Sequence, residues 1–131
     1  MATLTSDQLS QLATDYQALG NALSQYRFSN ASAFSPAEFE ELGDKIDSIT
    51  STSSDLGAMA TYAIADDISA QLISLTQATA EIGDALNKIK KVQGIIDIAA
   101  SVVNLGASLL SLNVNGIIDN TDGLVKAIKN V

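Results

Sequence analysis

The segment from Ile95 to Leu112 is the feature that most constrains the fold of this chain, because its eighteen residues carry one charge. Its polar residues recur at spacings of four and three, which places them on one narrow stripe of a helix. Apolar residues fill both sides of that stripe. This pattern favours a central helix of a bundle, buried on most sides. The polar positions are Asp97, Ser101, Asn104, Ser108 and Ser111.

One apolar flank of this helix is a candidate binding surface for a protein partner, a second copy of the chain or lipid. A helix of eighteen residues is about 27 Å long, slightly short of the ~30 Å hydrocarbon core of a membrane. Asp97 and Asn104 raise the cost of crossing that core. The residues of this candidate interface or membrane segment are Ile98, Val102, Leu105, Leu109 and Leu112.

Two helices are predicted before this segment. Residues 6–27 carry an apolar stripe at helical spacing, and Thr5 or Ser6 can cap its start. The run from Ser35 to Glu38 is a capping box with proline at the first helical position, and residues 34 and 39 are both phenylalanine, as a hydrophobic staple requires. The second helix is therefore predicted to begin at Pro36.

The ends of the later helices are less constrained. Residues 48–54 are rich in Ser and Thr, so the second helix either breaks near Ser53 or continues to about Ile64, and we favour the longer form. A third helix covers 68–89 and is expected to stop at Gly94, unless it runs on through that glycine. Residues 113–116 are expected to end the apolar helix, and a short final helix over about 123–129 can be capped by Thr121 or Asp122.

These elements predict an all-α fold in a single domain, residues 1–131. The expected architecture is an up-and-down, antiparallel four-helix bundle with a short C-terminal fifth helix.

Acidic residues are concentrated in the first half of the chain. The net charge is −8, and residues 1–67 carry ten acids and two bases, whereas residues 68–131 carry five of each. Such a chain is a poor candidate for binding nucleic acid, which needs clustered Lys and Arg. Carboxylates near a helix N-terminus are electrostatically favourable, but they also form a candidate docking face for a basic partner. That face comprises Glu38, Glu40, Glu41, Asp44 and Asp47.

Several kinds of chemistry are excluded by residue types that the chain lacks. Without His and Cys, Ser-His-Asp and Cys-His nucleophile systems and structural zinc sites cannot be built. Neither glycine-rich phosphate-loop motif occurs. Residues 119–123 resemble the start of a calcium-binding loop only superficially. Such a loop needs Gly at position 6 and Glu at position 12, whereas a loop that begins at Asp119 has Gly at position 5 and Asn130 at position 12. We expect no enzyme activity, no metal and no cofactor.

We therefore expect a non-catalytic protein that acts through protein–protein interaction, or as a structural component, with a protein partner or as a homo-oligomer. The alternative is a membrane-active protein that exposes residues 95–112, because long Ala/Ser/Thr-rich helices around one shielded apolar segment look like helical pore-forming toxins in general character. The first ten residues lack the basic and apolar regions of a signal peptide. This predicts a cytoplasmic protein, or one exported without a visible signal.

Overall fold

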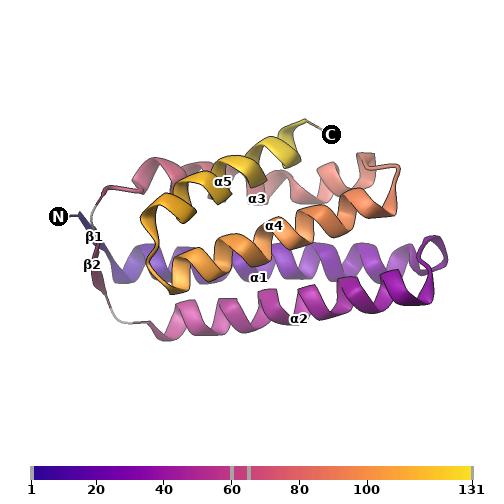
Figure 1. Ribbon diagram of the computed structural model, residues 1–131, viewed down its shortest axis with the longest axis horizontal. Helices are drawn as coiled ribbons and strands as arrows, with labels where there is room; N and C mark the ends of the chain where they lie inside the picture. Colours follow the sequence, from indigo (N-terminus) through magenta and orange to yellow (C-terminus); the bar gives the residue numbers. More distant parts are fainter. Residues whose placement is uncertain (1, 60, 65, 131) are drawn as a thin grey trace.

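Helices account for most of the fold in the computed structural model, which describes residues 2–59, 61–64 and 66–130, without the side chains of residues 2 and 62–64 (Figure 1). The described residues form an all-α bundle with a short C-terminal helix, as predicted. The helices are α1 (Ser6–Ser29), α2 (Pro36–Ala58), α3 (Ser69–Lys88), α4 (Val92–Leu110) and α5 (Val114–Lys129), with a 3-10 turn over Ala31–Ala33.

The five helices close a ring around the core in the order α1, α2, α4, α5, α3. Helix α1 packs between α2 and α3, and α4 crosses in front of it in Figure 1. Helices α3 and α4 follow one another in the chain, yet each packs mainly on other helices. As a result, α1 and α3 are direct neighbours although they are far apart in the sequence.

Both expected helix starts in the first half are confirmed. The Thr5 hydroxyl accepts a hydrogen bond from the backbone N–H of Gln8, and the Ser35 hydroxyl accepts one from that of Glu38. In each case the side chain at the third helical position returns a bond to the cap backbone, which completes a capping box. The staple is also present, since the rings of Phe34 and Phe39 meet edge to face with centroids 6.1 Å apart.

Neither end expected for the second helix is correct. The helix runs through Ser53, whose hydroxyl donates to the carbonyl oxygen of Ala13 in α1 at 2.7 Å and so stabilises helix packing. It ends at Ala58, well before Ile64. Residues Tyr62–Ile64 instead form strand β2, which pairs antiparallel with β1 (Ala2–Leu4) at the end of the bundle where α1 begins.

Two expectations based on glycine were wrong for the same physical reason. Gly94 does not end α3, which stops at Lys88; it lies in the first turn of α4, where a Cβ would come within 2.9 Å of the Ile89 side chain. Gly116 does not cap α4 but lies in the first turn of α5, where a Cβ would come within 2.6 Å of the Ser108 hydroxyl. Both glycines allow close packing rather than stopping a helix.

The last helix is longer than expected. It begins at Val114 rather than near residue 123, and the side chain of Asn113 caps it by accepting from the N–H of Gly116. Thr121 and Asp122 therefore lie inside the helix and do not cap it. A positive φ of 56° at Leu112 makes the tight turn between α4 and α5.

Helix α4 contributes more buried residues to the core than any other described helix. The polar stripe expected along it largely faces outward: Asp97, Asn104 and Ser111 are exposed and Ser101 is half-buried. Ser108 is buried, and its hydroxyl accepts a hydrogen bond from the Asn120 side chain of α5 at 2.9 Å. The stripe thus marks the outer side of a helix whose opposite side is buried against its neighbours.

Candidate functional site

The apolar flank of α4 lies inside the fold. Its members, which were the candidate interface, are Ile98, Val102, Leu105 and Leu109, all buried, and Leu112, half-buried. These side chains pack within the core cluster, so a partner or a lipid could reach them only if α4 left its neighbours. Whether the flank serves as an interface stays a prediction.

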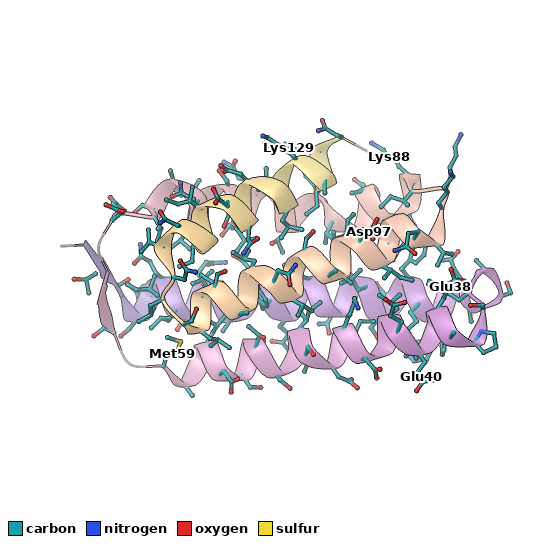
Figure 2. All side chains as sticks on the ribbon, in the orientation of Figure 1. Glu38, Glu40, Met59, Lys88, Asp97 and Lys129 are labelled. Atoms are coloured by element: carbon teal, nitrogen blue, oxygen red, sulfur yellow. The ribbon has the colours of Figure 1, made fainter. Side chains whose placement is uncertain are left out.

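The acidic residues proposed as a docking face follow the outer side of α2. Glu38 is half-buried, and Glu40, Glu41, Asp44 and Asp47 are exposed. Figure 2 shows Glu40 at the lower edge of the molecule and Lys88 and Lys129 at the upper edge. One ion pair lies along α2, with Lys45 Nζ 3.4 Å from Glu41 Oε1. Asp44 also lines a shallow hollow between α2 and α4.

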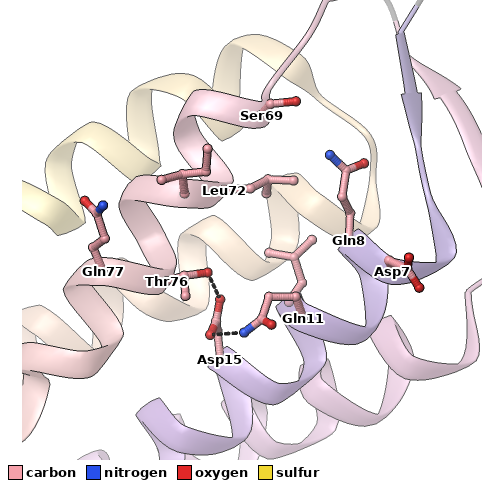
Figure 3. Close-up of a pocket in the computed structure, with 10 residues that line it drawn as sticks. Asp7, Gln8, Gln11, Asp15, Ser69, Leu72, Thr76 and Gln77 are labelled. Atoms are coloured by element: carbon pink, nitrogen blue, oxygen red, sulfur yellow. Dashed lines mark hydrogen bonds between the residues drawn. The ribbon is translucent and has the colours of Figure 1, made fainter.

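A mostly apolar groove lies elsewhere, between the N-terminal halves of α1 and α3 (Figure 3). It is a groove of about 410 Å³, within the size range of small-ligand pockets. Its walls are side chains one or two helical turns apart on these two helices, which run in the same direction. The lining residues are Asp7, Gln8, Gln11, Leu12 and Asp15 of α1, and Ser69, Leu72, Ile73, Thr76 and Gln77 of α3.

The apolar part of this groove comes from three side chains of graded exposure. Leu12 is buried in the core, Leu72 is half-buried, and Ile73 is 59% exposed. Among the described side chains, Ile73 and Phe28 are the large apolar residues that remain mostly exposed. Single exposed apolar residues are common on protein surfaces, whereas contiguous apolar surface marks binding sites. Ile73 matters here because it extends the apolar lining of the groove.

A buried carboxylate, Asp15, lies at the side of the groove. Only 4% of this residue is exposed. Its Oδ2 accepts a hydrogen bond from the Thr76 hydroxyl at 2.7 Å, and its Oδ1 accepts one from the Gln11 side-chain amide at 3.0 Å, as Figure 3 shows. The bond to Thr76 links α1 to α3 across the groove. These two contacts fix the orientation of the carboxylate.

Neutral groups supply all the hydrogen bonds that Asp15 receives from the described residues. The groove lining contains no Lys or Arg, and Asp15 forms no ion pair with any residue that the structure describes. A carboxylate offers about four lone-pair sites, and two donors leave part of this capacity free. The arrangement is unusual, because buried charges are normally paired. Asp15 is therefore an oriented anion whose charge the described chain does not neutralise.

The spacing and composition of the sequence did not predict this groove, although one local signal was present. Asp15 lies three residues after Leu12 and four before Leu19, so it occupies an apolar position of the α1 stripe. A charged residue at such a position indicates a buried polar contact. The other half of the groove comes from α3, some sixty residues later, and no local pattern indicates that α1 and α3 pack together.

Helix α4 has the length and composition of a membrane span. Among the described residues, α4 is the helix that is long and apolar enough to cross a membrane. Its mean hydropathy is 1.5, and half of its apolar stretch is buried within the bundle. Buried helices of water-exposed bundles share these properties, so length and composition do not separate the two cases.

No cluster of three or more potential metal ligands is present among the residues that the structure describes. A comparison with known protein families, with curated proteins and with solved structures finds no significant match to this chain.

Proposed function

We propose that this protein is a non-catalytic interaction protein that binds a segment of a partner polypeptide in the groove between α1 and α3. The observation that carries the proposal is the exposure of Ile73, 59%, beside the apolar surface of Leu12 and Leu72. A few anchor side chains that become fully desolvated at an interface contribute much of the free energy of protein association.

The groove has the polar rim that such an interface needs. The side chains of Gln8 and Gln77 line its edge with amide donors and acceptors, which suit the backbone of a bound segment. The hydrogen-bond partners of Asp15 are an amide and a hydroxyl, groups that orient a carboxylate and do not exchange protons with it near neutral pH. These features support binding rather than catalysis.

Photo-crosslinking tests the proposal. A photoreactive benzoylphenylalanine replaces Ile73 in the cells that produce the protein, and the same residue replaces Ser51, an exposed position of α2 outside the groove, as a control. We expect a discrete adduct from position 73 and none from position 51. The crosslinked protein is then purified, and its affinity for the parent and for Ile73→Ser is measured by calorimetry.

A partner whose affinity falls about tenfold or more with Ile73→Ser supports the groove as its binding surface, since removing an apolar anchor typically costs more than 1 kcal/mol. An adduct of twice the monomer mass identifies a second copy as the partner. Equal labelling from the two positions, or equal affinity of the parent and the variant, contradicts the proposal.

A second candidate function is membrane activity, and it is favoured by the length and apolar composition of α4. Lys90 and Lys91 directly precede this helix and are exposed, where they can meet anionic headgroups. In this proposal α4 leaves the bundle, and burial of its apolar surface in lipid offsets the lost packing.

Dye release from anionic and neutral liposomes between pH 4 and 8 tests this second candidate. Neutralising carboxylates at acidic pH lowers the repulsion between a chain of net charge −8 and anionic lipid, so release should increase as the pH falls. Asp97→Asn and Asn104→Leu should increase it further, by removing a charge and an amide from the segment. Absence of release by the parent and both variants contradicts membrane activity.

A further inference from the structure

We infer that the groove between α1 and α3 is selective for a cation: the partner segment inserts an Arg or Lys side chain whose charged group binds the carboxylate of Asp15. This inference rests on the proposed function, because it names the chemistry of the segment that occupies the groove. Its basis is the position of an oriented, unneutralised carboxylate in the wall of an apolar groove.

The free energy of a buried carboxylate explains the preference for a cation. A carboxylate with 4% exposure has lost most of its hydration, and two neutral donors replace only part of it. A guanidinium or ammonium group supplies both the missing donors and the opposite charge. Because the surroundings are apolar, the attraction between the two charges is stronger there than in water.

The shape of the groove suits a long side chain with a charged end. The methylene stem of Arg or Lys can pack along Leu72 and Ile73 while its charged group reaches Asp15, and both side chains commonly bury their stems in this way. Exposed Asp7 also lines this groove and adds a second negative charge to it. The negative charges of Asp15 and Asp7 would both repel an acidic partner segment.

Two small probes separate this inference from simple apolar binding. Hexylguanidinium carries a cation on an apolar chain, and hexylurea is its neutral counterpart of similar shape. Each is titrated into the purified protein, and the methyl resonances of Leu12, Leu72 and Ile73 are followed by NMR. We expect saturable shifts with hexylguanidinium and an affinity for hexylurea about tenfold weaker or worse, because hydrogen bonds to charged groups are stronger than neutral ones.

The variant Asp15→Asn assigns the selectivity to one carboxylate. Asn retains a carbonyl that accepts from Thr76 but removes the charge, so the two probes should bind this variant equally weakly. Asp55→Asn makes the same change in net charge on the exposed side of α2 and should leave the preference of the parent intact. Circular dichroism of each variant verifies that it is folded.

Three results would overturn the inference. The parent could bind the two probes with equal affinity, it could bind neither, or Asp15→Asn could bind hexylguanidinium as tightly as the parent does. The proposed function is tested separately by crosslinking at position 73. A partner that binds the parent and Asp15→Asn equally, yet loses affinity with Ile73→Ser, would retain the interaction function and refute cation selectivity.

Discussion

The Tyr16 hydroxyl donates a hydrogen bond to the carbonyl oxygen of Val102 at a distance of 2.8 Å, which joins α1 to α4 through the centre of the bundle. The Tyr16 side chain is fully buried. Burial raises the pKa of this phenol well above its ordinary value of 10.0, because the phenolate would lose its hydration. The contact therefore stabilises the fold only while the phenol is protonated.

Alkaline pH should destabilise the protein through this residue. The folded-state pKa of Tyr16 is above the unfolded value, so its contribution to stability is complete below pH 10 and decreases as the pH rises further. Tyr16→Phe should cost about 0.5–1.5 kcal/mol at pH 7 through the lost hydrogen bond. Above pH 10 its stability should fall less steeply than that of the parent. Urea unfolding from pH 7 to 11 measures both effects, with the half-buried Tyr26→Phe as control.

Placing a charge on the buried side of α4 should unfold the domain. Leu105 is fully buried and Ala107, two residues later, is exposed. Leu105→Asp leaves an unpaired charge in the core and should cost several kcal/mol, a large part of the total stability. Ala107→Asp should change stability little. Thermal unfolding followed by circular dichroism compares them; similar melting of the two variants would show that α4 is placed incorrectly.

Two helical glycines should respond oppositely to substitution by alanine. At Gly106 a Cβ would come within 2.9 Å of the Thr52 side chain and 3.2 Å of the Tyr16 ring, so Gly106→Ala should destabilise the contact of α4 with α1 and α2. At Gly123 nothing lies within 4 Å, so Gly123→Ala should stabilise α5 by about 0.4–1 kcal/mol. Chemical denaturation gives both free energies, and a gain in stability from Gly106→Ala would refute the close approach.

Loss of the second N-cap should weaken α2. Ser35→Ala removes the acceptor for the N–H of Glu38 and should cost about 0.5–2 kcal/mol. Phe34→Ala should also destabilise the protein, because it removes the contact with Phe39. Ser51→Ala, in the exposed middle of α2, is the matched control and should be neutral or slightly stabilising. A loss from Ser35→Ala no greater than that from the control would argue against the cap.

Local chemistry predicted the starts of the first two helices and the orientation of α4, because caps and apolar spacing lie within a few neighbouring residues. Gly94 and Gly116 were wrongly predicted to end helices. Each instead leaves room for a neighbouring side chain, Ile89 or Ser108, and that close contact is seen only in the packed structure. Strand β2 could not be anticipated either, since it exists through pairing with residues 2–4, some sixty positions earlier. The groove at Asp15 likewise depends on α1 meeting α3.

A crosslinking scan over three surfaces of the molecule tests the central claim most directly. Benzoylphenylalanine is placed singly at position 73 in the groove, at Asp47 on the acidic face of α2 and at Asn104 on the exposed stripe of α4. If the groove is the binding surface, only position 73 should give a discrete protein adduct, and Asp15→Asn should weaken it. An adduct from position 47 or 104 with none from position 73 would contradict the account.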